Sequence, residues 1–323
     1  MNLFCPIHHS PLESRVSEEI YYCSSGCTFP ITKGIPRFVS SDEYASSFGL
    51  QWNSFRRTQL DSFTGLSISR DRLTRLAGGS LDIMKGKNIL EAGCGAGRFT
   101  EIILSAGAHV FAADISNAVE ANYTNCKEYS NYFICQADIL KLPVLPEKFD
   151  IVICVGVIQH TPDPEETISA LCSHVKPGGK LIFDHYSYGH EITLSRRLLR
   201  SFLVKRSKIF SMRFCRFLTG ALWPFHKLFW KIRKIPVIRS VRSRIFLKLS
   251  PVVDYQDAYP QLGSQLLYEW AILDTHDSLT DVYKHLRSAE DIYNHLQQCG
   301  MTEIETAYTG NGVEVRARKP LLN

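Results

Sequence analysis

The stretch NILEAGCGAGRFTEIILSAGAHVFAADIS, residues Asn88 to Ser116, decides the fold of this chain. It holds a short apolar run, a glycine-rich turn, a helical pattern and a second apolar run that ends in Asp114. This order predicts a strand–helix–strand unit of a parallel sheet. In such sheets ligands bind beyond the carboxyl ends of the strands, where a glycine turn admits the ligand and the next helix points its N–H groups at it. The stretch therefore predicts a site for a nucleotide-like cofactor.

The residues around this stretch continue the alternation of strand and helix. Short apolar runs predict strands at Asn88–Ala92, His109–Asp114, Tyr132–Ala137, Phe149–Val155 and Lys180–His185. Residues 187–287 interrupt the pattern, which resumes with a helix at Glu290–Cys299 and strands at Glu303–Tyr308 and Val313–Arg318. Apolar strands separated by helices are typical of a parallel sheet covered on both faces. We therefore predict an α/β, doubly wound, mostly parallel fold.

Changes in composition divide the chain into five regions. We expect a small Cys/His-bearing unit at 1–40, a helical linker or cap at 41–85, a cofactor-binding core at 86–186, a basic helical insertion at 187–287, and a helix with closing strands at 288–323.

Composition argues against several classes of protein. An apolar fraction of 45% in 323 residues supports a buried core and argues against wholesale disorder. The start MNLFCPIHHS lacks the features of a secretory signal, and no uncharged apolar stretch approaches the ~18 residues of a membrane-spanning helix. Most of the ten cysteines lie singly in strand-like or helix-like runs, as buried thiols do in a reducing compartment. We therefore expect a cytoplasmic protein.

The spacing of the glycine turn favours one class of cofactor. A dinucleotide-binding turn reads G-x-G-x-x-G/A, but here the third small position is Arg98. The glycines instead run Gly93, Gly95 and Gly97, and the carboxylate of Glu91 precedes them. A carboxylate at this place suits a ligand with an ammonium group and is poorly placed beside a pyrophosphate. A purely structural turn is the alternative.

Five ordered segments resemble the class I S-adenosylmethionine-dependent methyltransferases. They are ILEAGCGAGRF, VFAADIS, CQADILKLP, FDIVICVGVIQHTPDP and LCSHVKPGGKLIFDHY, within residues 86–186. The resemblance implies a seven-stranded methyltransferase sheet and a cofactor site made of Glu91, Gly93, Gly95, Gly97, Asp114, Ile115, Asp138, Ile139 and Gly156. In that family's pattern, Glu91 and the glycine turn hold the methionine portion, Asp114 takes the ribose hydroxyls, and Asp138 accepts from the adenine amino group. The two isoleucines then pack on the adenine.

The resemblance also places residues 156–160 beside the transferred methyl group. The sulfonium already activates that methyl, so the protein supplies alignment and, for an oxygen or nitrogen nucleophile, a base. His160 follows the fourth strand and His185 ends the fifth, so we predict either as the base, with Gln159 orienting the substrate. The alternative is that each histidine only makes hydrogen bonds within its loop.

The first forty residues contain two pairs of metal-ligand residues. Cys5-x-x-His8 and Cys23-x-x-x-Cys27 suit tetrahedral zinc, and a unit of this size hardly buries a stable core without such help. The turn ITKGIPRF resembles the zinc-ribbon-like module found ahead of methyltransferase domains, with His8 in place of a cysteine. His9 is an alternative ligand. Unligated cysteines in a degenerate remnant are the other interpretation.

One segment carries the whole positive excess of the chain. Residues 191–250 contain 16 Lys and Arg and one acid, Glu191, whereas the rest of the chain has 21 basic and 31 acidic residues. Apolar residues recur at helical spacing from Phe210 to Ile232, although Pro224 is expected to kink or break that helix. Three interpretations stay open: a helical lid with a solvated basic face, peripheral contact with an anionic membrane, or a nucleic-acid surface.

Two further stretches, FGLQWNSFRRTQLDSFTG and LLYEWAILDTHDSLTDVYKHLRS, resemble methyltransferases of bacterial surface-polysaccharide and small-molecule biosynthesis. The resemblance implies a small-molecule or lipid-linked acceptor, such as a saccharide, handled at the inner membrane surface. Asp274, His276 and Asp277 then line the acceptor pocket, or serve only as capping and turn residues. The alternatives are an RNA base methyltransferase, since zinc-ribbon-bearing ribosomal RNA methyltransferases share the order of units, and a non-catalytic cofactor-binding adaptor.

Overall fold

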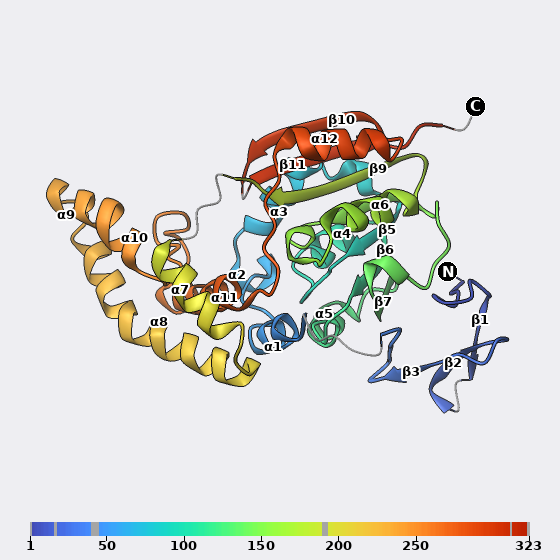
Figure 1. The fold of residues 1–323 in the computed structure, drawn as a ribbon, viewed down its shortest axis with the longest axis horizontal. Helices are drawn as coiled ribbons and strands as arrows, with labels where there is room; N and C mark the ends of the chain where they lie inside the picture. Colours follow the sequence, from blue (N-terminus) through green and yellow to red (C-terminus); the bar gives the residue numbers. More distant parts are fainter. Residues whose placement is uncertain (1, 16–17, 40–44, 189–192, 311, 322–323) are drawn as a thin grey trace.

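A computed structural model describes residues 2–15, 18–39, 45–188, 193–310 and 312–321, and its centre is a seven-stranded sheet. The strand order is β10-β11-β9-β8-β5-β6-β7 (Figure 1). The strands are β5 (Asn88–Ala92), β6 (His109–Asp114), β7 (Tyr132–Gln136), β8 (Phe149–Cys154), β9 (Val175–Tyr186), β10 (Thr302–Thr309) and β11 (Gly312–Arg318). The neighbours from β9 to β7 pair in parallel, whereas β11 pairs antiparallel with β9 and β10. The predicted doubly wound, mostly parallel sheet is confirmed.

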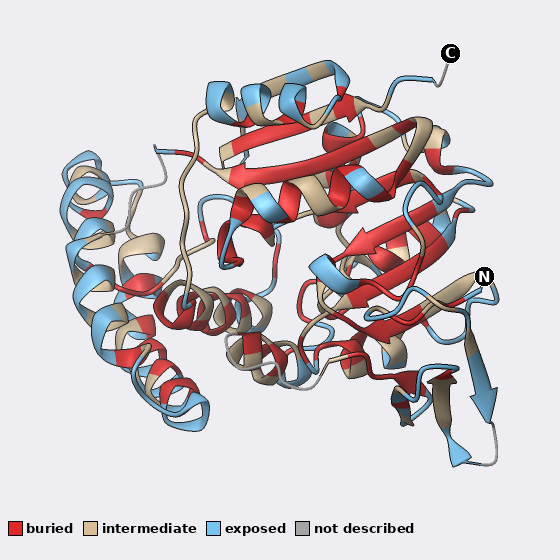
Figure 2. Cartoon of the chain, turned by 45° about the vertical axis from the view of Figure 1, so that its right-hand side comes forward, coloured by how far each residue is buried: buried red, intermediate tan, exposed pale blue. Residues whose placement is uncertain are grey.

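Helices cover both faces of this sheet. They are α3 (Ile68–Leu76), α4 (Thr100–Ser105), α5 (Val119–Cys126), α6 (Pro164–His174) and α12 (Ala289–Gln298). Adjacent residues of a strand face opposite sides, so Leu90 packs with α6 and α12 in one buried cluster and Ile89 packs with α3, α4 and α5 in another. Figure 2 shows the strands buried between these two layers.

The strand boundaries differ slightly from those expected from the sequence. Strand β9 begins at Val175, five residues before the predicted start at Lys180. Gly178 and Gly179 lie within it, and its pairing with β8 shifts register between Phe149 and Ile151. Glycines in a strand often accompany such an irregularity, which explains why this part of the sequence reads as a turn.

The N-terminal unit is a small antiparallel sheet beside the edge strand β7. Its strands follow the order β1 (Leu12–Arg15), β2 (Ile20–Cys23), β3 (Thr28–Thr32) and β4 (Ile35–Pro36). Arg37 forms a parallel bridge with Gln136 of β7, and the Phe38 N–H donates to the Gln136 carbonyl at 2.7 Å. The Phe4 N–H donates to the Pro143 carbonyl at 2.9 Å. The unit therefore covers an edge of the large sheet that would otherwise be open.

Two helical regions flank the carboxyl ends of the parallel strands. The first contains α1 (Ser46–Ser54), α2 (Asp61–Thr64), α3 and the 3₁₀ turn η3 (Asp82–Met84). The insertion contains α7 (Leu194–Leu203), α8 (Lys208–Lys231), α9 (Pro236–Val241), the π-helical turn η6 (Arg242–Phe246), α10 (Leu247–Leu249) and α11 (Ser264–Thr280). Figure 1 shows α8 and α9 as an arm on the side of the molecule away from the N-terminal unit. Short 3₁₀ turns η4 (Ile139–Lys141) and η5 (Ile158–His160) follow β7 and β8.

Of the two outcomes expected of Pro224, a kink or a break, the break does not occur, because α8 continues through this position. A proline removes one intrahelical hydrogen bond and crowds the carbonyl four residues earlier, here that of Gly220. The packing of α8 on α11 holds the helix through this position.

None of the helices in the described residues has the length and apolar character of a membrane-spanning segment.

Candidate active site

A cavity of about 830 Å³ opens at the carboxyl ends of the parallel strands. Its walls come from the glycine turn after β5, the ends of β6, β7 and β8, the N-terminal helices and the insertion. This volume falls within the range of roughly 300–1,000 Å³ that is typical of small-molecule sites. One cavity thus joins the predicted cofactor site to the two helical regions.

The glycine turn contributes its backbone to this cavity. Gly93 and Gly95 line it, and both have positive φ angles, 75° and 48°. A Cβ on Gly93 would lie 2.4 Å from Cγ2 of Val157, so no larger residue fits there without a shift. Gly97 does not line the cavity; a Cβ at this position would meet Asn122 at 3.2 Å, so this glycine allows the turn to pack on α5.

Glu91 lies beneath the turn rather than in the cavity. Its carboxyl is 3% exposed and accepts a hydrogen bond from Oγ1 of Thr100 at 2.6 Å. Burial penalises the charged form and raises the pKa of Glu91 to about 8. The expected direct contact of Glu91 with a ligand ammonium group is therefore not supported by this geometry.

Two acidic residues at strand ends face the cavity as the sequence predicts. The carboxylate of Asp114 accepts hydrogen bonds from the Gly95 N–H at 2.9 Å and from the Ser116 N–H at 2.8 Å, which fixes it at the end of β6. Asp138 caps η4 and accepts from the Leu140 N–H at 3.0 Å. Ile115 and Ile139 line the cavity beside these acids and supply apolar surface.

The turn η5 after β8 brings His160 into the cavity, next to Gly156 and Val157. Nδ1 of His160 lies 3.1 Å from the Tyr283 carbonyl oxygen and 3.4 Å from Oδ2 of Asp281. Burial lowers the pKa of His160, but the contact with Asp281 and the charge of Asp277 outweigh it, so the pKa is raised. Both neighbours of Nδ1 are acceptors, so Nδ1 carries a proton and Nε2 is the nitrogen that can accept one.

His185 does not line the cavity. Side chains alternate along a strand, so Tyr186 of β9 lines the cavity while His185 is on the face of the sheet that α6 and α12 cover. Its Nδ1 lies 2.9 Å from the Tyr186 carbonyl, and burial lowers its pKa to about 4. The hypothesis that His185 is the base is therefore not supported. Gln159 is also buried away from the cavity, at 1% exposure, so its expected role in orienting the substrate is not supported either.

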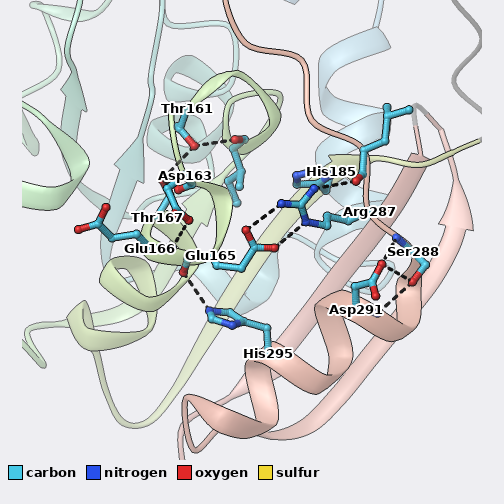
Figure 3. A network of polar contacts seen from close by, with 12 residues as sticks. Thr161, Asp163, Glu165, Glu166, Thr167, His185, Arg287, Ser288, Asp291 and His295 are labelled. Atoms are coloured by element: carbon cyan, nitrogen blue, oxygen red, sulfur yellow. Dashed lines mark hydrogen bonds and ion pairs between the residues drawn. The ribbon is translucent and has the colours of Figure 1, made fainter.

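A strap of residues 281–287 holds the active-site turn in place. The His285 N–H donates to the Gln159 carbonyl at 2.9 Å, and the Arg287 N–H donates to the Tyr186 carbonyl at 3.0 Å. Figure 3 shows the guanidinium of Arg287 on Glu165 at the start of α6, through contacts of 2.6 and 2.9 Å. The strap therefore joins the insertion to both the turn after β8 and the helix that follows it.

Helix α11 of the insertion provides an acidic wall. Asp274 and Asp277 line the cavity as expected, whereas His276 points away and its Nδ1 lies 2.6 Å from Oε1 of Gln51. Burial and the neighbouring Asp277 raise the pKa of Asp274 to about 7, although its hydrogen bond with Tyr255 lowers it. This wall therefore offers a carboxyl that can donate as well as accept hydrogen bonds near neutral pH.

The sequence did not identify the contribution of Arg98 to the cavity. Its Nε donates to Ser69 and its Nη1 to Gln59, both at 2.8 Å, and its guanidinium lies 5.6 Å from the ring centroid of Trp270. Arg98 thus joins the glycine turn to the N-terminal helices and to α11. The sequence did contain one indication of this role: Arg98 stands where a dinucleotide-binding turn has a small residue.

Four residues of the N-terminal unit form a second cluster, remote from the cavity. The metal-ligating atoms of Cys5, His8, Cys23 and Cys27 all lie within 4.8 Å of one another. The sulfur of Cys27 is 3.5 Å from Nδ1 of His8, and the other two sulfurs are 3.7 Å from it. His9 has a positive φ angle of 54° and lies outside the cluster. Three thiols and one imidazole form the donor set of a structural zinc site.

Comparison with known proteins gives a family for the central segment. Residues 90–183 match the family described as "Methyltransferase domain". The "Ubiquinone biosynthesis O-methyltransferase" of Coxiella burnetii (strain RSA 493 / Nine Mile phase I) is 36% identical over 103 residues, 31% of this chain and 44% of the relative. The protein of the same name from Pseudomonas fluorescens (strain SBW25) is 33% identical over 104 residues, with the same coverage. The chain thus spans less than half the length of these curated relatives.

Solved structures show a broader but weaker likeness. The magnesium protoporphyrin IX methyltransferase of Synechocystis PCC 6803, crystallised with bound SAH, aligns with a TM-score of 0.44 at 18% identity, over 86% of this chain and 97% of that chain.

Proposed function

We propose that this chain, which carries a methyltransferase domain of class I, transfers the methyl group of S-adenosylmethionine to a hydroxyl of a small-molecule acceptor. One observation carries the proposal: a single cavity is lined by the glycine turn, by the acids at the ends of β6 and β7, by His160 and by the acids of α11. The relatives that match residues in the domain are named as O-methyltransferases, which supports an oxygen nucleophile.

The residues at the strand ends fit this cofactor. Gly93 lies close to Val157 and has no side chain, so only its backbone borders the place where the methionine portion would lie. Asp114 would accept hydrogen bonds from the ribose hydroxyls, and Asp138 from the adenine amino group. Ile115 and Ile139 would pack on the adenine. When bound, the cofactor supplies a methyl group that its sulfonium has already activated.

His160 would remove the proton of the acceptor hydroxyl. Its ring is held by Phe48 and Tyr186, whose ring centroids lie 5.5 and 5.4 Å away. Nε2 would accept the proton of the hydroxyl, and Asp281 would stabilise the resulting imidazolium. Because the pKa of His160 is raised, the neutral form that would act as the base becomes populated at a higher pH than for an ordinary histidine.

The acidic wall would bind an acceptor that carries several hydroxyls. Asp274 and Asp277 can accept hydrogen bonds from hydroxyls, and a protonated Asp274 can also donate one. Tyr255 and Trp270 pack edge to face, with ring centroids 5.3 Å apart, and give the same wall an apolar surface. Carboxyls beside aromatic rings suit a saccharide or another polyhydroxylated compound, in free or lipid-linked form. Acids at this place disfavour an RNA acceptor, since its phosphates would be repelled.

We also propose that Cys5, His8, Cys23 and Cys27 bind one structural zinc ion. A unit this small has little apolar surface to bury on its own, and a metal would supply the missing stability. Its role would be to hold the unit against β7 and the segment that includes Asp138.

Binding and transfer test the proposal separately. Calorimetry with S-adenosylhomocysteine should show binding to the unaltered chain, and Asp114→Ala should weaken it by about 10- to 150-fold, the effect of losing charge-assisted hydrogen bonds. Asp82→Ala, an exposed acid outside the cavity, is the matched control. Lack of binding by the unaltered chain would contradict the cofactor site and revive the adaptor hypothesis.

The acceptor is identified with methyl-labelled cofactor and fractionated cell extract. Label should enter a hydroxylated small-molecule or lipid fraction, and His160→Ala should abolish most of the transfer while the cofactor still binds. Label entering RNA or protein would refute the acceptor class.

A further inference from the structure

We propose that helices α7, α8 and α9 form a docking face for an anionic lipid surface. This inference concerns a surface outside the cavity and does not depend on the proposed methyl transfer. It rests on the faces of α8, on the exposed apolar residues beside it and on the charge of the segment.

Helix α8 has two apolar faces, and only one of them is covered. The side that packs on α11 consists of Met212, Cys215, Thr219, Trp223 and His226, which are all buried. Residues of an α-helix turn by about 100° each, so Phe210, Phe217, Phe225 and Leu228 lie on the opposite side. These four are 45%, 73%, 52% and 53% exposed. The apolar stripe predicted from the sequence is therefore the outer face of the helix, not the one that packs on the protein.

The outer face continues onto the neighbouring helix α7. Leu194, Leu198 and Phe202 follow one another at four-residue spacing and are 68%, 63% and 42% exposed. The rings of Phe202 and Phe210 have centroids 6.3 Å apart, so the two helices share this surface. Residues 194–249 hold 13 of the 22 exposed large apolar side chains of the described residues. Soluble monomers rarely expose so many in one region.

A row of cations runs along the flank of the same face. Arg213, Lys227 and Lys231 lie between the covered and the outer side of α8, Lys234 follows in the turn after the helix, and all four are exposed. The sequence has no Asp or Glu from 192 to 253. Within the described residues, the ion pairs of Lys and Arg in this segment are confined to Arg200 and Arg242.

Phenylalanines flanked by cations match one kind of partner. Interfacial burial favours the aromatic rings, and an anionic leaflet attracts the Lys and Arg beside them. Double-stranded nucleic acid would engage the cations but would leave the exposed Phe217 and Phe225 in water. Figure 2 shows exposed turns along the outer side of the arm, where such a surface would lie. Charge complementarity therefore favours anionic lipid as the occupant of this face.

Vesicle sedimentation tests the proposal on the full chain. The protein should pellet with vesicles of phosphatidylcholine and 30% phosphatidylglycerol, and should stay in the supernatant with phosphatidylcholine alone. Phe217→Ser/Phe225→Ser should weaken binding at least tenfold by removing interfacial burial. Lys227→Gln/Lys231→Gln should weaken it about 25-fold, about fivefold for each cation, and 0.5 M salt should have a similar effect.

Matched controls separate the face from general effects. Phe63→Ser/Tyr293→Ser and Lys127→Gln/Lys148→Gln change exposed residues of the same kinds elsewhere and should leave vesicle binding unchanged. Circular dichroism and S-adenosylhomocysteine binding should be the same for all variants, so loss of vesicle binding is distinct from loss of the cofactor site. Failure of the unaltered chain to pellet, or equal pelleting of the Phe217→Ser/Phe225→Ser variant, would overturn the proposal. A stable dimer that this variant dissociates would overturn it as well.

Discussion

The close contact between Gly93 and Val157 allows a quantitative test of the turn. We predict that Gly93→Ala destabilises the chain and that a second change, Val157→Ala, restores part of the loss. The new Cβ would lie 2.4 and 2.8 Å from the two γ-carbons of Val157, and 3.0 Å from its Cβ. Distances this short require one of the two segments to move.

The expected cost has two parts. An alanine at φ 75° is strained by about 1–2 kcal/mol. Overpacking against Val157 adds about 1–3 kcal/mol. Val157→Ala removes both γ-carbons and with them most of the overpacking, at its own cost of about 1 kcal/mol for lost burial. The double variant should therefore be more stable than the sum of the single changes predicts, by about 1–3 kcal/mol.

Urea denaturation of the four proteins of this double-mutant cycle measures the coupling. Gly65→Ala is the control, because Gly65 also has a positive φ, 71°, but no atom within 4 Å of the added Cβ. It should cost only the backbone strain. Calorimetry should show that Gly93→Ala also weakens cofactor binding, since Gly93 lines the cavity. Additive effects of Gly93→Ala and Val157→Ala, or equal costs for Gly93→Ala and Gly65→Ala, would refute the steric argument.

Three further predictions concern single residues. The pKa of Glu91 is raised to about 8 in the folded chain, so the free energy of unfolding should fall between about pH 4.5 and pH 8, by at most about 1.4 kcal/mol per pH unit. Urea denaturation without cofactor should show a weaker decline for Glu91→Gln. An equal decline in this variant would contradict the buried carboxyl. Elemental analysis should find about one zinc per chain, lost in His8→Ala and kept in His9→Ala, and the opposite result would exclude the observed cluster as the site. The rate of transfer should rise with pH through a value above the ordinary pKa of histidine, and a pH profile that His160→Gln leaves unchanged at a reduced rate would exclude His160 as the base.

Much of the fold could be predicted because the signals are local. Strands such as Asn88–Ala92 and His109–Asp114 are short apolar runs between clear turns, and the structure has the same boundaries. The continuity of α8 through Pro224 depends instead on packing against α11, which is more than forty residues away in the sequence. Long-range contacts of this kind override local propensity, and a single sequence does not show them.

The candidate site could be predicted where a role depends on position along a strand. Asp114 and Asp138 line the cavity because the first ends one parallel strand and the second lies just beyond the end of another. His185 lies outside the cavity because it is on the opposite face of β9 from Asp184, and a difference of one residue reverses the direction of a side chain. Glu91 also lies outside the cavity, with its carboxyl hydrogen-bonded to Thr100, a contact that the sequence does not indicate.

Asp281 connects the outer helices to the active-site turn. Its carboxylate lies 2.8 Å from Nε of Arg200 on α7, 3.0 Å from Nζ of Lys284 on the strap and 3.4 Å from Nδ1 of His160. Buried charges such as that of Asp281 cost desolvation free energy, and replacing them by apolar groups is often neutral or stabilising, so stability alone does not explain such a network. The network holds Nδ1 of His160 in one place, as the proposed role of this histidine as a base would require. The same carboxylate also joins α7, through Arg200, to the turn that carries His160.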